Sequence, residues 1–170
     1  MFKIAGLVGL TLCTGLTGLL YSMKLRERII LLEDYMEMIL SIKSSINYMR
    51  EPLIMINQRG SKSGSKAFEL FDKVRHDIHE KNAEMSQIWA QNAFQIYEGT
   101  PLEKEDIDII CYTGTFLGQT DFENQLARFQ YLENRLSERI ETAKENYACM
   151  GPLYRKLGFF SGGLIALIFI

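Results

Sequence analysis

The chain has 170 residues, with 19 lysine and arginine residues against 21 aspartate and glutamate residues and a formal net charge of −2. That length favours a single domain, and the acidic balance argues against nucleic acid as a partner. Cys13, Cys111 and Cys149 lie far apart without a C-x-x-C pair; Cys13 falls in an apolar N-terminal run, and Cys111 and Cys149 are expected to be free thiols.

An uncharged, apolar run covers residues 4–21. Because about 20 apolar residues cross a bilayer, we expect residues 1–22 to form an N-terminal transmembrane helix. A cleaved signal peptide also begins with a charge and an apolar run, but no small-residue cleavage site follows here. Small residues recur four apart within this run, a spacing that lets membrane helices pack closely: Ala5, Gly9, Cys13 and Thr17.

A second apolar run begins at Leu157, and we expect residues 153–170 to form a C-terminal membrane segment. Here too small residues lie four apart: Gly158, Gly162 and Ala166. Such spacing favours helix packing, although glycine is common in membrane helices for other reasons.

Cations flank both apolar runs on their inner sides. They follow the first run and precede the second: Lys24, Arg26, Arg28, Arg155 and Lys156. The positive-inside rule therefore predicts that residues 23–152 lie in the cytoplasm.

Residues 23–152 have the periodicity of helices. A first helix is expected to continue straight out of the membrane from Met23 to Met49, with apolar residues three and four apart: Leu25, Ile29, Leu32, Met36, Ile39 and Ile46. Pro52 suits the first turn of a short helix that ends near Arg59, and residues 60–65 have the composition of a flexible linker.

Further helices follow this linker. Ser65 can cap a helix that ends near Asn82, and Ser86 can cap one that ends near Gly99. Thr100 and Glu103 form a capping box for the next helix, with Pro101 at its first position. Acidic residues crowd its early turns, where the helix dipole stabilises them, and this is a simpler role than acid–base catalysis: Glu105, Asp106 and Asp108.

The helix that begins near Thr100 should end at Gly118, and a second capping box, at Thr120, begins a final helix that ends near Met150. The first and last helices should run antiparallel, because one leaves the membrane and the other returns to it. Gly151-Pro152 should bend or break the chain. The predicted fold is all-α: a cytoplasmic antiparallel helical bundle of about six helices, flanked by an N-terminal and a C-terminal membrane helix.

Three motifs in this order resemble those of the stage III sporulation protein AB family. Residues 46–53 resemble its I-x-Y-x-x-x-P-L turn, although Ser45 stands where an acidic residue is expected. Residues 114–125 resemble its L-G-x-x-D-x-x-x-Q signature, and Tyr154 to Gly158 with Gly162 resemble its closing membrane anchor.

The resemblance implies a membrane platform subunit of the channel that joins mother cell and forespore in endospore-forming bacteria. The family is similar to the cytoplasmic domain of the inner-membrane platform proteins of type II secretion and type IV pilus machines. The implied partners are a secretion-type ATPase, other sporulation channel membrane proteins and membrane lipid, with a homo-oligomer as a further option. The implied location is the outer forespore membrane, with the middle domain on the mother-cell side.

The motif residues suggest a partner-binding corner between two helices. Its candidate residues are Leu117, Gly118, Thr120, Asp121 and Gln125, together with Tyr48, Pro52 and Leu53. A rigid helix-turn-helix corner, in which Gly118 ends one helix and Thr120 or Asp121 caps the next, accounts for the same residues. Both interpretations stay open.

Catalytic motifs are lacking: there is no glycine-rich phosphate loop, no H-E-x-x-H and no G-x-S-x-G. His76 and His79 could chelate zinc, but a zinc site needs three or four protein ligands and a solvated helix surface is the simpler interpretation. We therefore expect neither enzyme activity nor a cofactor nor a metal.

A membrane-tethered helical signalling or regulatory module, dimerising through its stalk, is the alternative function. The two functions differ in what the stripe from Leu25 to Ile46 contacts. An antiparallel helix of the same chain favours the platform, and a second copy favours the signalling module.

Overall fold

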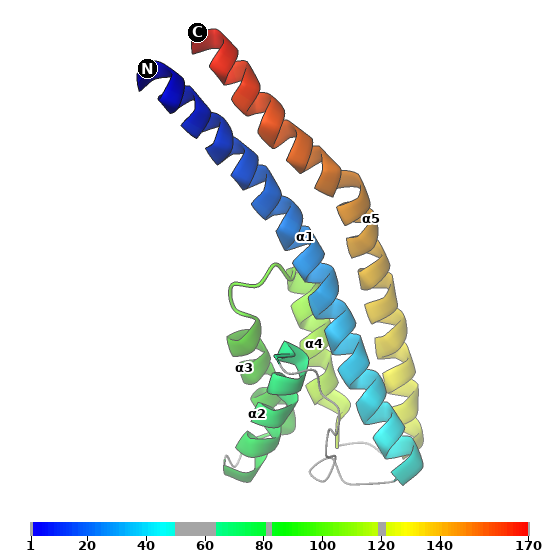
Figure 1. Cartoon of the computed structure of the whole chain (residues 1–170). Helices are drawn as coiled ribbons and strands as arrows, with labels where there is room; N and C mark the ends of the chain where they lie inside the picture. Colours follow the sequence, from blue (N-terminus) through cyan, green and yellow to red (C-terminus); the bar gives the residue numbers. More distant parts are fainter. Residues whose placement is uncertain (1, 50–63, 81–82, 119–121, 170) are drawn as a thin grey trace. The chain divides into compact units, whose positions relative to one another are not determined.

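The computed structural model describes residues 2–49, 64–80, 83–118 and 122–169, with residues 2–12, 47–49, 79, 122, 159 and 162–169 described by their backbone alone. The described residues form five helices (Figure 1): α1 (Phe2–Met49), α2 (Lys66–Glu80), α3 (Met85–Tyr97), α4 (Lys104–Phe116) and α5 (Phe122–Phe169). This confirms the all-α class.

The helix expected from Met23 continues directly from the N-terminal segment within α1, and the C-terminal segment continues directly from the last helix within α5. Both stretches favour a helix, and no proline separates them near residue 22. The short helix expected from Pro52 lies outside the described residues.

The chain divides into two compact units, Met1–Ile29 with Glu141–Ile170, and Ile30–Ile140. We call them the two-helix unit and the five-helix unit. No helix in the described stretches is both long enough and apolar enough to cross a membrane.

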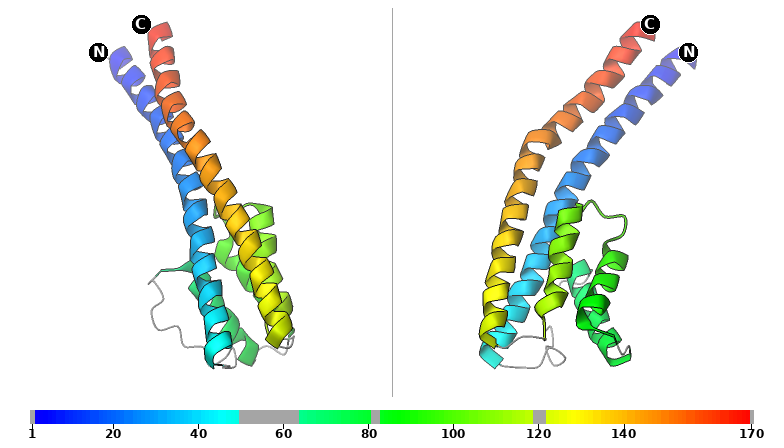
Figure 2. Two further views of the ribbon diagram at one scale, coloured as in Figure 1. Left: turned by 90° about the vertical axis from the view of Figure 1, so that its right-hand side faces the viewer. Right: turned by 180° about the vertical axis from the view of Figure 1, so that it is seen from behind.

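In the two-helix unit, α1 and α5 run antiparallel and side by side (Figure 2). Gly151 lies beside Ser22, and Gly158 lies beside Thr14 and Gly18. The chain was expected to bend or break at Gly151-Pro152, and because the α5 helix continues through Pro152 it does not break there. Proline in a helix costs about 3 kcal/mol, and we attribute the continuity to the contacts with α1 on either side of Pro152.

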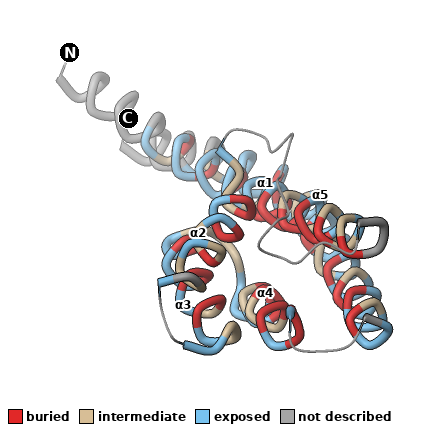
Figure 3. The backbone as a smooth tube through the Cα atoms, turned by 90° about the horizontal axis from the view of Figure 1, so that it is seen from below, coloured by how far each residue is buried: buried red, intermediate tan, exposed pale blue. Residues whose placement is uncertain are grey.

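In the five-helix unit, each helix contributes buried residues (Figure 3). The largest fully buried side chains are Trp89, Tyr35, Phe71, Phe116, Phe129, Leu32, Met38, Ile39, Ile42, Leu70, Ile88 and Ile110. The predicted α1 stripe is too narrow, because Tyr35, Met38 and Ile42 are buried as well. The reason is that α1 contacts three elements: Asp34 accepts from the Ala67 N–H of α2, Tyr35 reaches α4, and Lys43 pairs with Glu133 of α5 at 2.7 Å.

The start of α2 is as predicted. The Phe68 backbone N–H donates to Ser65 Oγ at 3.2 Å, so Ser65 is the cap. Asp34 of α1 strengthens this end of the helix, because its Oδ2 accepts from the Ser65 hydroxyl at 2.7 Å and from the Ala67 backbone N–H at 3.3 Å. A carboxylate there also faces the positive end of the helix dipole.

The starts of α3 and α4 differ from the prediction. Glu84, not Ser86, is the N-cap of α3. Glu103, not Thr100, is the N-cap of α4, in a capping box with Asp106. Thr100 instead closes the turn after α3, since its hydroxyl donates to the Tyr97 carbonyl at 2.6 Å, and the α4 helix can begin only after that turn.

We predict that Gly18→Leu separates the helices of the two-helix unit. A Cβ on Gly18 would collide with the Tyr154 carbonyl oxygen. Leucine is the better helix former by about 1 kcal/mol, so any loosening must come from lost packing. Hydrogen–deuterium exchange of the full chain should become faster across residues 13–29 and 141–161. The control Thr17→Leu, at an exposed neighbouring position, should leave exchange unchanged; equal exchange in both variants would contradict the close approach.

Candidate functional site

The predicted partner-binding corner is only partly within the described residues. Leu117, Gly118 and Gln125 are described, Tyr48 has a described backbone, and Pro52, Leu53, Thr120 and Asp121 lie outside the description. Leu117 is fully buried and caps the end of α4, with its backbone N–H donating to the Thr113 carbonyl at 3.2 Å. Gly118 has a φ of 75°, which confirms the left-handed helix stop.

Gln125 joins the two sides of this corner. Its side chain is buried, and its Nε2 donates to the Phe116 carbonyl at 3.4 Å, which ties the first turn of α5 to the last turn of α4. Phe116 also packs edge-to-face on Phe129, with ring centroids 5.1 Å apart. The corner is therefore held by an aromatic pair and an amide, and these contacts are those of a rigid corner.

Gly114, at the start of the second motif, is needed for close helix packing. A Cβ at this position would collide with the Cβ of Trp89, so α3 and α4 can approach only around glycine. Trp89 Nε1 donates to the Ile110 carbonyl at 2.9 Å. The Tyr35 hydroxyl lies 2.7 Å from Thr113 Oγ1 and 3.2 Å from the same Ile110 carbonyl. Side chains of α1, α3 and α4 thus meet at one turn of α4.

A second polar cluster joins α4 to α5. Arg139 Nε lies 2.7 Å from Asp106 Oδ1, and its Nη2 lies 2.6 Å from Glu103 Oε2. Asp106 is fully buried and also accepts from the Glu103 backbone N–H at 2.9 Å. Partial burial lowers the pKa of Arg139, but its hydrogen bonds and charge interactions with Asp106 and Glu103 raise it above the ordinary value. This arrangement stabilises charges and offers no proton for catalysis.

The two histidines that could chelate zinc, His76 and His79, do not form part of a ligand group among the residues described. His76 is exposed, with nitrogens 3.9 Å from Asp77 and 3.8 Å from Glu80, and the His79 side chain lies outside the description. No group of three potential ligands occurs within the described stretches. Cys111 is half-buried, and burial raises its pKa, the opposite of what a reactive thiol needs.

A comparison of the chain with protein-family models identifies its family. The model of the stage III sporulation protein AB family matches residues 3–170. The chain belongs to the stage III sporulation protein AB family. Comparisons with curated proteins and with solved structures found no match.

The family motifs acquire a physical meaning from these contacts. Gly114, Leu117, Gly118 and Gln125 of the second motif all serve the junction of α4 with its neighbours. The third motif includes Gly158, which packs against Thr14, Gly15 and Gly18 of α1. The described motif residues thus build a helix junction and a helix pair.

The small-residue stripe proposed for residues 5–17 does not make the described contacts of α1 with α5. Cys13 and Thr17 are exposed, whereas Gly15 and Gly18 are buried against α5. Ala5, Gly9, Gly162 and Ala166 are described only by their backbone. The spacing of Gly15, Gly18 and Ser22, three and four apart, was the signal that could have identified the contacting face.

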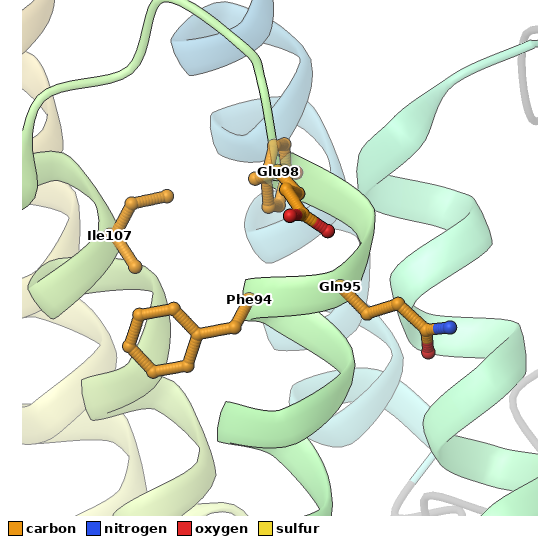
Figure 4. A pocket seen from close by; sticks show the side chains of 5 residues that line it. Phe94, Gln95, Glu98 and Ile107 are labelled. Atoms are coloured by element: carbon orange, nitrogen blue, oxygen red, sulfur yellow. The ribbon is translucent and has the colours of Figure 1, made fainter.

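A surface groove of about 450 Å³ lies between the end of α3 and the start of α4 (Figure 4). Phe94, which is 61% exposed, and Ile107 project into the space between the two helices, while Gln95 points the other way. Tyr97 borders the groove and is buried, and its hydroxyl has no hydrogen-bond partner among the described residues. Burial, followed by the charges of Asp34 and Glu69, raises the pKa of Tyr97.

The Arg139 cluster leads to a stability prediction. Asp106→Asn should lower the free energy of unfolding by about 2–4 kcal/mol, because it leaves the Arg139 charge without its buried partner. Glu105→Gln removes a carboxylate 3.8 Å from the same arginine and should change stability by about 0.5 kcal/mol or less, since that side chain is 64% exposed. Urea unfolding of the full chain in detergent, followed by Trp89 fluorescence, measures both. Equal losses of unfolding free energy in the two variants would contradict the special role of the Asp106–Arg139 pair.

The buried tyrosines predict a loss of stability at high pH. Burial raises the pKa of Tyr35 above its ordinary value near 10, so the neutral form is favoured in the folded state. Stability is then full below about pH 10 and falls above it, by up to about 1.4 kcal/mol per pH unit for each buried tyrosine.

Phe substitutions at the two tyrosines form a matched pair. Tyr35→Phe should cost about 1 kcal/mol at pH 7 through its lost hydrogen bond, whereas Tyr97→Phe, which removes a hydroxyl without a partner, should be neutral or stabilising. Each substitution should make the loss of folding stability above pH 10 less steep. A steep loss that persists when both tyrosines are replaced would show that other groups cause it.

Proposed function

We propose that this chain is a non-enzymatic platform subunit of a secretion-like channel that forms between mother cell and forespore during endospore formation. It couples a cytoplasmic secretion-type ATPase to the membrane subunits of the channel. Membership of the stage III sporulation protein AB family supports the sporulation role. The apolar ends with flanking cations support a membrane location with the middle of the chain in the cytoplasm.

The main structural support is the partner of the α1 stripe. Within the five-helix unit, α1 meets α4 through Tyr35 and α5 through Lys43, so its buried face is covered by helices of its own chain. A signalling module that dimerises through its stalk needs that face for a second copy. The intrachain pairing therefore favours a platform, in which a rigid domain transmits force between partners.

The docking point of the ATPase is proposed at the end of the five-helix unit that carries the family motifs. The last turn of α1, the end of α4 and the start of α5 lie at one end of this unit (Figure 1). Gln125 and the Phe116–Phe129 pair hold that end in one geometry. A preorganised surface of this kind loses little conformational entropy when a partner binds.

Affinity purification of the tagged full-length chain from sporulating cells tests this function. A secretion-type ATPase and channel membrane proteins should copurify, and Asp121→Ala or Gln125→Ala should reduce ATPase recovery by at least tenfold. The control Glu123→Ala removes an exposed side chain of the same turn and should keep full recovery. Recovery of only the chain itself, or of a kinase, would refute the platform and favour the signalling module.

A further inference from the structure

A band of aromatic and cationic side chains crosses both helices of the two-helix unit. The rings of Tyr21 and Tyr154 stack with their centroids 5.5 Å apart, and Lys24 Nζ lies 6.0 Å from the centre of the Tyr21 ring. Both tyrosines are exposed. A tyrosine has an apolar ring and a polar tip, and such side chains are favoured at the headgroup level of a bilayer.

The surface changes character at this band. Toward the chain ends, large apolar side chains are exposed on both helices: Leu16, Leu19, Leu20, Leu157 and Phe160. A groove of about 360 Å³ on α1 runs from this apolar side to the charged side, from Thr17 and Leu20 past Tyr21 to Lys24 and Glu27. Seven residues of helix separate Thr17 from Lys24, which corresponds to about 10 Å, comparable to the depth of a lipid headgroup and its first acyl carbons.

The band carries an excess of positive charge. Lys24 on α1 and Arg155 and Lys156 on α5 are exposed, and Glu27 is the acidic residue that borders the groove. Arg155 Nε also donates to the Gly151 carbonyl at 3.3 Å, which holds the guanidinium beside the helix pair. Cations next to an exposed apolar groove match a ligand that has a negative head and an apolar tail.

We propose that Tyr21, Lys24, Tyr154, Arg155 and Lys156 form a binding band for the headgroups of anionic phospholipids. The tyrosine pair sets the depth at which the two helices sit, and the cations select lipids that carry a phosphate without a compensating ammonium group. The inference rests on the proposed membrane location, and it adds a preference for one class of lipid. Each cation near an anionic membrane surface contributes a factor of about five in association, equivalent to about 1 kcal/mol.

Spin-labelled lipids measure this preference directly. The full-length chain is reconstituted in phosphatidylcholine bilayers that contain labelled phosphatidylglycerol or labelled phosphatidylcholine, and electron paramagnetic resonance gives the fraction of each lipid held at the protein. Labelled phosphatidylglycerol should be held several-fold more strongly. The triple variant Lys24→Gln, Arg155→Gln and Lys156→Gln should bring the ratio of bound labelled phosphatidylglycerol to bound labelled phosphatidylcholine close to one.

The matched control loses three cations from elsewhere in the chain, through Lys73→Gln, Arg75→Gln and Lys104→Gln on α2 and α4, and it should keep the preference. A ratio of one in the unaltered chain, or equal ratios in the two triple variants, would overturn the lipid band. Stable reconstitution in phosphatidylcholine with a ratio of one would refute the band and leave the membrane location intact. If the chain binds phosphatidylglycerol vesicles and a carbonate wash removes it, the spanning helices would be refuted and the band would be supported.

Discussion

The antiparallel pairing of α1 with α5 is the constraint on which the rest of the chain depends. In the two-helix unit it rests on glycine, because Gly18 and Gly158 let the two backbones approach more closely than any larger residue would allow. In the five-helix unit it rests on side chains, with the Lys43–Glu133 ion pair between the same two helices. Because α1 is paired within the chain, the face that carries its buried residues, among them Leu32, Tyr35 and Ile39, is not available to a second copy.

Polar contacts then fix the position of α4 among its neighbours. The Ile110 carbonyl accepts a hydrogen bond from Trp89 Nε1 of α3 and lies beside the Tyr35 hydroxyl of α1. Asp106 forms an ion pair with Arg139 of α5. Apolar packing alone would tolerate a helix that slides by part of a turn. Hydrogen bonds and a buried ion pair do not tolerate such sliding, because a displaced partner leaves a buried polar group unpaired. A domain held in this way suits the transmission of force between partners.

Local signals in the sequence predicted the parts of the fold that depend on local physics. The all-α class, the Ser65 cap and the left-handed stop at Gly118 each follow from periodicity or from one residue's conformational preference. The capping box of α4 was misplaced because Thr100 and Glu103 satisfy the usual Ser/Thr-x-x-Glu pattern, whereas the observed box, formed by Glu103 and Asp106, does not. The competing bond from Thr100 to the Tyr97 carbonyl is visible only in the structure.

Contacts between distant segments could not be predicted in the same way. No spacing rule connects Arg139 to Asp106, or Gln125 to the Phe116 carbonyl, because each bond depends on how two helices pack. The second buried face of α1, with Tyr35 and Met38, was missed for a related reason: a one-stripe pattern assumes one partner helix, whereas α1 contacts α2, α4 and α5. The proposed docking role of the corner likewise depends on a second protein, and no spacing within this chain identifies one.

Thiol cross-linking of the full chain would test the central pairing most directly. In a background without the native cysteines, one variant carries cysteine in place of Tyr21 and Tyr154, and another carries it in place of Lys43 and Glu133. A short bifunctional thiol reagent should join each pair within one chain, giving a faster-migrating monomer on a denaturing gel. Covalent dimers as the main product, with no intrachain cross-link in either variant, would contradict the pairing and with it the platform proposal.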